Sequence, residues 1–280
     1  MGPIAAQGHT KEYFAWKLIQ QCLGEKKMGN RTPLIAGNWK MYKTTPEAVD
    51  TARQLVDLVA DSADVDIMIA PVFTALDPVS RVVGDSRVAL GAQNLYWEKE
   101  GAYTGEISAD MLVSVGCQYV IIGHSERRQF FGETDETVNQ KIRAAIDADL
   151  IPVFCVGESE AEREAGQTFS VLDKQVKKGL DKYFAKDLAT LVIAYEPVWA
   201  IGTGKTATKE QAQEVHAHIR SLIEQMFDPS LAQSVRILYG GSVKPDNIAA
   251  LMEMPDIDGG LVGGASLEAG PFSKIVKFNS

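Results

Sequence analysis

A carboxylate suited to removing a proton stands at the end of a buried strand. Glu196 follows the continuous apolar run Leu191–Ala194 and directly precedes Pro197. Such a run is typical of a strand buried on both faces, and a proline, which has no amide hydrogen, ends it. Glycines and Lys205 come next. This order predicts a base at a strand end, followed by a loop that closes as a unit.

Reactive and small residues also follow other apolar runs. They are Asn38 and Lys40 after the first run, Gln93 and Asn94 after the third, His124, Ser125 and Glu126 after the fourth, Gly240, Gly241 and Ser242 after the seventh, and Gly263 and Gly264 after the eighth. Taken alone, each has an ordinary explanation, because loops are polar and a strand-end carboxylate often serves only in a salt bridge. Their recurrence favours one shared site, because the ends of parallel strands meet on one face.

Eight apolar runs predict eight strands. The runs are residues 34–37, 67–70, 88–91, 119–123, 152–156, 191–194, 237–239 and 260–262. The segments between them carry helix-start signals, such as the capping boxes Thr44-x-x-Glu47 and Thr208-x-x-Gln211. Eight strand-helix units favour a closed (β/α)8 barrel of the α/β class over an open doubly wound sheet, since closure leaves no edge strand. We expect a single domain at residues 33–280, with eight parallel strands inside and helices outside.

Charge and hydropathy exclude several classes of partner. The formal net charge is −9 and the pI is about 5.1, so no basic field attracts nucleic acid or an anionic membrane. No apolar run approaches the ~20 residues that a membrane span needs. An anionic ligand must therefore be held by local groups.

The cysteines and paired histidines do not predict a metal site. Cys22, Cys117 and Cys155 show no Cys-x-x-Cys spacing, which argues against zinc and a disulfide framework and favours a reducing cytoplasm. Cys155 lies in an apolar strand and is expected to be a buried structural thiol. His216 and His218 are two residues apart on an expected helix, so their side chains diverge and we expect both at the surface.

The amino end differs from the rest of the chain. Residues 1–27 lack the basic and apolar regions of a secretory signal. We expect residues 1–32 to be an appended extension that takes no part in the barrel.

Five motifs together resemble those of the triosephosphate isomerase family. They are Gly37-Asn38-Trp39-Lys40-Met41, Gly123-His124-Ser125-Glu126-Arg127-Arg128, Ala194 to Lys205, Tyr239-Gly240-Gly241-Ser242-Val243, and Val262-Gly263-Gly264-Ala265. The resemblance extends from Pro33 to the end of the chain. It implies a TIM barrel that interconverts dihydroxyacetone phosphate and glyceraldehyde 3-phosphate, in glycolysis and gluconeogenesis, with neither cofactor nor metal.

The resemblance also assigns roles to residues. Glu196 is implied as the base, His124 as the electrophile that stabilises an enediolate, Lys40 as a nearby cation and Asn38 as a neutral donor. The pairing of a glutamate base with a neutral histidine is this family's own known pattern. Glu126 is expected to orient Lys40 through an ion pair, with Ser125 and Glu126 both in supporting roles. The implied phosphate site consists of backbone amides at Gly202, Ser242, Gly263 and Gly264, together with Lys40.

The long loop Gln93–Glu106 resembles the dimer loop of the family. It carries aromatic residues that a monomer would leave exposed. The implied homodimer places Thr104 of one chain against Asn38 and Lys40 of the other.

Two other functions stay open at this point. Another phosphate-binding barrel enzyme, such as an aldolase or a synthase of amino-acid biosynthesis, would share the strands and glycine pairs but not the set of His124, Glu196 and closing loop. A non-catalytic binding protein would have lost or blocked these residues, which are all present.

Overall fold

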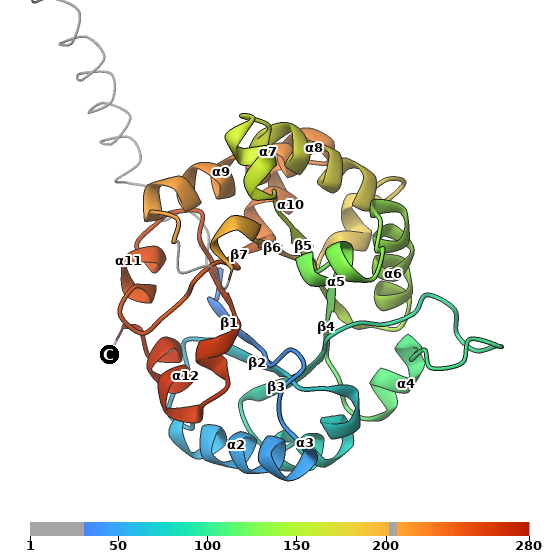
Figure 1. Cartoon of the computed structure of the whole chain (residues 1–280), viewed down its shortest axis with the longest axis vertical. Coiled ribbons are helices and arrows are strands. Elements are labelled where there is room, and N and C mark those ends of the chain that lie inside the picture. Colours follow the sequence, from blue (N-terminus) through green and yellow to red (C-terminus); the bar gives the residue numbers. More distant parts are fainter. Residues whose placement is uncertain (1–30, 202–205, 280) are drawn as a thin grey trace, which may run out of the picture. The chain divides into compact units, whose positions relative to one another are not determined.

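The strands close into a barrel, as the sequence predicts. The computed structural model describes residues 31–201 and 206–279. Each strand pairs in parallel with the next, and β8 pairs with β1. Viewed as in Figure 1, the strands ring the centre and the helices lie outside them. The strands are β1 (Leu34–Asn38), β2 (Asp66–Ala70), β3 (Val88–Ala92), β4 (Tyr119–Ile122), β5 (Ile151–Val156), β6 (Val192–Tyr195), β7 (Arg236–Tyr239) and β8 (Gly259–Val262).

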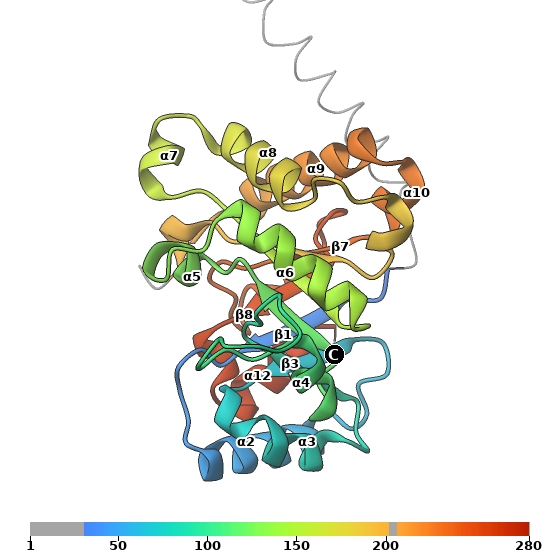
Figure 2. The same cartoon turned by 90° about the vertical axis from the view of Figure 1, so that its right-hand side faces the viewer.

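Helices connect the strands and cover their outer faces (Figures 1 and 2). Both predicted capping boxes are present, at Thr44 before α2 and at Thr208 before α9. Short 3₁₀ turns occupy Phe73–Ala75, Ala185–Leu188, Val198–Ala200 and Gly264–Ser266. The helices are α2 (Thr45–Leu58), α3 (Leu76–Val83), α4 (Ala109–Ser114), α5 (Ser125–Phe130), α6 (Asp135–Asp147), α7 (Glu160–Glu164), α8 (Thr168–Gly179), α9 (Lys209–Met226), α10 (Pro229–Ser234), α11 (Ile248–Met252) and α12 (Ala269–Val276).

Two apolar cores follow from the alternation of side chains along each strand. Leu34 and Ala36 belong to a cluster inside the barrel, together with Met68 and Leu238. Ile35, between them in sequence, belongs to the larger cluster that strands and helices share. Because both faces of every strand are covered, the strands read as continuous apolar runs.

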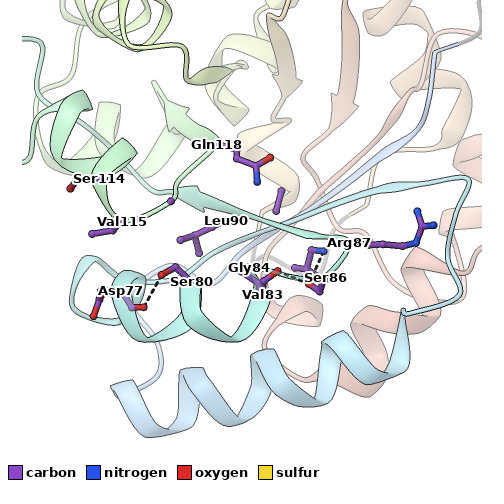
Figure 3. A pocket seen from close by; sticks show the side chains of 13 residues that line it. Asp77, Ser80, Val83, Gly84, Ser86, Arg87, Leu90, Ser114, Val115 and Gln118 are labelled. Carbon is purple, nitrogen blue, oxygen red and sulfur yellow. Dashed lines mark hydrogen bonds between the residues drawn. The ribbon is translucent and has the colours of Figure 1, made fainter.

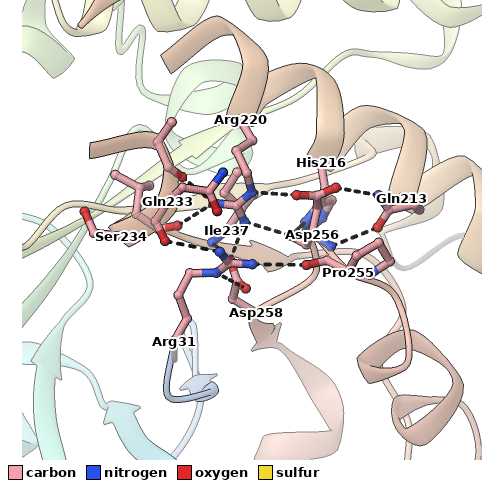
Figure 4. A network of polar contacts seen from close by, with 12 residues as sticks. Arg31, Gln213, His216, Arg220, Gln233, Ser234, Ile237, Pro255, Asp256 and Asp258 are labelled. Atoms are coloured by element: carbon pink, nitrogen blue, oxygen red, sulfur yellow. Dashed lines mark hydrogen bonds and ion pairs between the residues drawn. The ribbon is translucent and has the colours of Figure 1, made fainter. Parts of the chain in front are cut away.

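A network of charges fastens α9 to the amino ends of β7 and β8 (Figure 4). Arg220 of α9 donates to Asp256 at 2.6 Å and to Asp258 at 2.7 Å. Arg31 donates to the other carboxylate oxygen of Asp258 at 2.6 Å, and the amide of Ile237 also donates to Asp258. Arg31, Arg220 and Asp258 are nearly buried, so removing Asp258 would leave both arginines without this carboxylate.

The expectation that His216 lies at the surface is wrong. Its side chain is fully buried and packs between α9 and the barrel, with ring centroids 5.9 Å from Tyr195 and 6.4 Å from Tyr239. His216 lies four residues after Ala212, which is also buried, so it shares the inward stripe of α9. Nδ1 of the ring lies 3.2 Å from the carbonyl oxygen of Asp256, whereas Nε2 has no hydrogen-bond partner among the described residues. His218, on the next face, is half-exposed.

Cys117 and Cys155 are free and buried, as predicted for Cys155. Across residues 31–201 and 206–279, no helix is long and apolar enough to cross a membrane. Within the same residues, no group of three or more His, Cys, Asp or Glu side chains is placed to hold a metal ion.

Candidate active site

Glu196 lies immediately after β6, with its side chain turned into the end of the barrel. Its amide donates to the carbonyl of Val156 on β5 at 2.7 Å, which continues the strand pairing by one residue. Pro197 then ends the ladder and begins a short 3₁₀ turn. The residue is only 2% exposed, so a carboxylate stands where the chain would otherwise bury an apolar group.

Two close donors contact the carboxylate of Glu196. One oxygen, Oε1, lies 2.9 Å from Nε2 of His124, and the other accepts the amide of Ser125 at 2.9 Å. Burial raises the pKa of Glu196, but His124, the Ser125 amide and Lys40 together outweigh it, so the pKa lies below its ordinary value of 4.5. The carboxylate is therefore ionised at neutral pH, as a base must be.

His124 directly precedes α5, and its ring is held at both nitrogens. Nδ1 accepts the amide hydrogen of Glu126 at 3.2 Å, which requires a lone pair on that nitrogen. The ring is then neutral, and Nε2 carries the hydrogen that faces Glu196. Burial lowers the pKa of His124, but the carboxylates of Glu196 and Glu126 outweigh it, so the pKa lies above its ordinary value of 6.5. The hydrogen bond at Nδ1 opposes this shift, because only a ring without a hydrogen on Nδ1 can accept the Glu126 amide.

Lys40 follows β1 in a left-handed conformation, with φ of 50°. Its amide donates to the side chain of Asn38 at 3.0 Å, and its carbonyl accepts from Gln93 at 2.8 Å. Its ammonium donates to Glu126 at 2.6 Å, which is the ion pair expected from the sequence. A Cβ built on Gly263 would lie 3.4 Å from Cε of Lys40, so the Lys40 side chain lies beside Gly263, which follows β8.

Seven of the predicted site residues line one cavity of about 370 Å³. The catalytic candidates Asn38, Lys40, His124 and Glu196 form part of its wall, and Ser242, Gly263 and Gly264 form another part. Ser125 and Glu126 contact these residues from α5. The sequence did not indicate four further lining residues, which are Tyr42, Lys244, Leu261 and Leu267. They lie within loops or apolar runs and carry no distinctive spacing.

Ser125 and Glu126 only contact residues of the cavity wall, which leaves two further predicted residues, Thr104 and Gly202. Thr104 is exposed in the loop between β3 and α4, and it does not line the cavity. Gly202 lies outside the described residues.

A second cavity, of about 510 Å³, shares no lining residue with the first. It lies beside α3 and the segment that follows α4 (Figure 3). Its charged lining residues are Asp77 and Arg87, and Asp77 already pairs with Arg81. Nothing in this lining matches the chemistry of the first cavity.

Comparison with known proteins decides which family this constellation represents. A sequence model of triosephosphate isomerase matches residues 33–279. The chain belongs to the triosephosphate isomerase family. Members of the family interconvert dihydroxyacetone phosphate and D-glyceraldehyde 3-phosphate, and this is the reaction of the enzyme described here. The aldolase, synthase and non-catalytic alternatives are set aside by this match.

Individual relatives agree with the family match. The chain is 59% identical to triosephosphate isomerase of Geobacter metallireducens over 250 residues, which are 89% of this chain and 100% of that protein. It is also 59% identical to the enzyme of Trichlorobacter lovleyi over 248 residues, 89% of this chain and 99% of that one. Among solved structures, triosephosphate isomerase from Bartonella henselae is similar, with a TM-score of 0.80 and 38% identity over 88% of this chain and 98% of its own.

Proposed function

We propose that Glu196 is the base that carries the proton in this isomerisation. The reaction removes one hydrogen from C1 of dihydroxyacetone phosphate and adds one to C2, while the hydroxyl hydrogen passes from O1 to O2. A carboxylate between the two carbons serves both, first as base and then, once protonated, as acid. The observation that carries this proposal is the contact of 2.9 Å between an ionised, buried Glu196 and the Nε2 of His124, in the wall of a cavity.

His124 and Lys40 are proposed to stabilise the enediolate that forms between the two proton transfers. Negative charge develops on O2 and then on O1, and the Nε2 hydrogen of a neutral imidazole can donate to either oxygen. Lys40 adds a positive charge, and Asn38 a neutral donor, on the same side of the cavity. Glu126 holds the Lys40 ammonium at 2.6 Å and also bonds Nδ1 of His124 through its amide, so it orients both groups.

The phosphate group is proposed to bind at Ser242, Gly263 and Gly264, with Gly202 joining them. The glycines carry no Cβ, so their amides can approach the phosphate oxygens. Lys40 lies beside Gly263 and supplies local positive charge in a chain whose net charge is −9. This arrangement supports a triose phosphate lying across the cavity, with its phosphate at β7 and β8 and its carbons near Glu196.

Ser125 is proposed to hold Glu196 in its resting position. Its amide donates to Oε2, and its hydroxyl lies 3.5 Å from Oε1. Substrate must displace some of these donors, because the carboxylate needs free lone pairs to take a carbon-bound proton. The contacts therefore keep the base ionised and aligned until substrate arrives.

Conversion of glyceraldehyde 3-phosphate in D₂O, monitored with a coupled assay, tests the proposed chemistry. A carboxylic acid exchanges its proton with solvent, so we expect deuterium on the carbon that receives the proton. A direct shift of hydride between the carbons would leave the product free of solvent deuterium, and that result would contradict a base mechanism. Mass spectrometry of the product reads the difference.

We also propose that the enzyme is a homodimer formed through the loop at residues 93–106. This loop projects past α4, away from the barrel (Figure 1). Its aromatic side chains stack on one another, with Tyr96 4.0 Å from Trp97 and 4.8 Å from Tyr103 between ring centroids. Further large apolar side chains lie exposed after β1, at the start of the 3₁₀ turn after β2, on α4 and at the end of α5. They are Met41, Tyr42, Phe73, Met111, Val113, Phe130 and Phe131.

A second copy of the chain is the occupant that this surface fits. Large contiguous apolar patches mark interaction sites, and we infer that these exposed side chains contribute to one. Met41 and Tyr42 directly follow Lys40, so a partner seated there would bring Thr104 of its loop towards Asn38 and Lys40. Sedimentation velocity at assay concentration is expected to show a dimer. A fully active monomer would remove this proposal.

We further propose that the catalytic domain comprises residues 33–280, with residues 1–32 as an extension, and that the enzyme works in the cytoplasm. The family match, which begins at residue 33, supports the first statement. The free thiols of Cys117 and Cys155 support the second, because such thiols are typical of a reducing compartment.

A further inference from the structure

The backbone of Glu196 packs against a glycine that tolerates no side chain. Gly157 follows β5, and a Cβ built on it would lie 1.7 Å from the carbonyl oxygen of Glu196. A second glycine, Gly240, lies on the other side, where a Cβ would come within 2.9 Å of Cγ of Glu196. The catalytic glutamate therefore lies between two backbone segments in direct contact with it.

The residues on both sides of Gly157 are bonded to the chain around Glu196. The carbonyl of Val156 accepts the amide of Glu196 at 2.7 Å, and the carbonyl of Glu158 accepts the amide of Val198 at 3.1 Å. Gly157 lies between these two bonds, at the point of closest approach. A displacement of its peptide groups must therefore displace Glu196.

Gln175, on the outer helix α8, holds both peptide groups of Gly157. Its Oε1 accepts the Gly157 amide at 2.8 Å, and its Nε2 donates to the Gly157 carbonyl at 3.0 Å. Gly157 lies beyond the last residue of β5, so the barrel ladder does not provide these bonds. A glutamine amide offers one acceptor and donors in a fixed plane, so two bonds to one residue set its orientation as well as its position.

We propose that Gln175 is a positioning residue for the isomerisation, which fixes the Glu196 carboxylate by clamping Gly157 against its backbone. This inference rests on the proposed role of Glu196 as the base. Gln175 touches neither the cavity nor the reacting groups. Its effect is confined to geometry, to which proton transfer is sensitive, since a misplacement of about 1 Å can cost on the order of 10²-fold in rate.

Replacing Gln175 by Met tests the clamp. Methionine has a similar length and helix propensity but neither bond to Gly157. We expect kcat to fall about tenfold, with KM changed less than about twofold. The reason is that the residues proposed to bind the substrate phosphate, which follow β7 and β8, stay in place. The acid limb of the profile of kcat/KM against pH should move upward, because a displaced Glu196 loses part of its contact with His124 and Ser125, which lower its pKa.

Lys174→Met provides the matched control. Lys174 precedes Gln175 on the same helix and is exposed, so this variant changes the helix in the same way without touching Gly157. Its kcat and pH profile are expected to equal those of the parent. Gln175→Glu serves as a milder second variant, because it keeps the acceptor for the Gly157 amide and loses only the donor to its carbonyl.

Unchanged kcat and an unchanged acid limb in both Gln175 variants would overturn the clamp, even if their melting temperatures fell. The result also separates this inference from the proposed function. If Glu196→Gln loses turnover while Gln175→Met keeps it, only the clamp is wrong. If Glu196→Gln itself keeps normal turnover, the proposed base is wrong and the clamp falls with it.

Discussion

Glu196 and His124 share a hydrogen bond and are both buried, and burial alone would favour the neutral form of each. The glutamate stays ionised because hydrogen-bond donors contact it. The amide hydrogen at Nδ1 keeps the histidine neutral, although the neighbouring carboxylates raise the pKa of His124. Environment thus gives two titratable groups different protonation states at one pH. That difference supplies both a base and a hydrogen-bond donor within 2.9 Å of each other.

Burial also shifts the pKa of His216, a residue with no proposed catalytic role. Burial lowers its pKa to about 4, from an ordinary value of 6.5. The unfolded chain therefore takes up a proton near pH 6.5 while the folded chain does not. The contribution of a neutral His216 to the free energy of unfolding is fully present above pH 6.5. It falls as the pH decreases towards 4, by about 3 kcal/mol in total.

Urea unfolding of the parent and of His216→Gln between pH 7.5 and pH 5 tests this prediction, at one fixed protein concentration. The variant keeps an N–H donor for the Asp256 carbonyl but does not titrate. We expect its free energy of unfolding to fall less than that of the parent, by about 2 kcal/mol over this interval. His218→Gln, at a half-exposed position, is the control and should follow the parent. Parallel curves for the parent and His216→Gln would rule out this source of acid sensitivity.

The strands and the amphipathic helices could be predicted from sequence because their spacing is regular. Strands buried on both faces read as apolar runs, and the reactive residues at their ends must gather once the strands are parallel. Gln175 gave no such signal, because a polar residue within a helix normally faces solvent. The prediction that His216 lies at the surface is wrong for a related reason. Its residue type favours the surface, whereas its spacing from Ala212 places it on the buried stripe of α9.

Barrel closure depends on a backbone conformation at the start of β8. Gly259 has φ of 144°, and a Cβ built on it would lie 1.9 Å from the carbonyl oxygen of Leu34 on β1. Gly259→Ala is therefore expected to lower the free energy of unfolding by at least about 2 kcal/mol, through backbone strain and loss of the β8–β1 contact. Denaturant unfolding measures the change.

Gly270→Ala is the matched control for this element. Gly270 lies in α12, and no atom lies within 4 Å of a Cβ built there. Its replacement should leave stability unchanged or raise it by up to about 1 kcal/mol. Equal stability of the two variants would show that closure tolerates a side chain at Gly259.

The exposed apolar surface is a property of the whole molecule and predicts how activity depends on assembly. Met41 is 92% exposed and directly follows Lys40, so Met41→Glu would place a charge inside the proposed interface without disturbing the core. We expect this variant to sediment as a monomer and to lose at least about tenfold in kcat/KM, because Lys40 loses the support of the partner loop.

Phe184→Glu is the control for assembly. Phe184 is 70% exposed and lies between α8 and β6, apart from the proposed interface. This variant should remain a fully active dimer. A dimeric and fully active Met41→Glu enzyme would contradict the proposed interface.

Turnover of Glu196→Gln tests the central claim most directly. The substitution keeps size and hydrogen bonding but removes the base, so kcat should fall by about 10² to 10⁴ or more. The circular dichroism spectrum and the affinity for inorganic phosphate should match those of the parent, because the residues proposed to bind phosphate follow β7 and β8 and are not changed. Near-normal turnover in a folded, phosphate-binding Glu196→Gln enzyme would contradict the account.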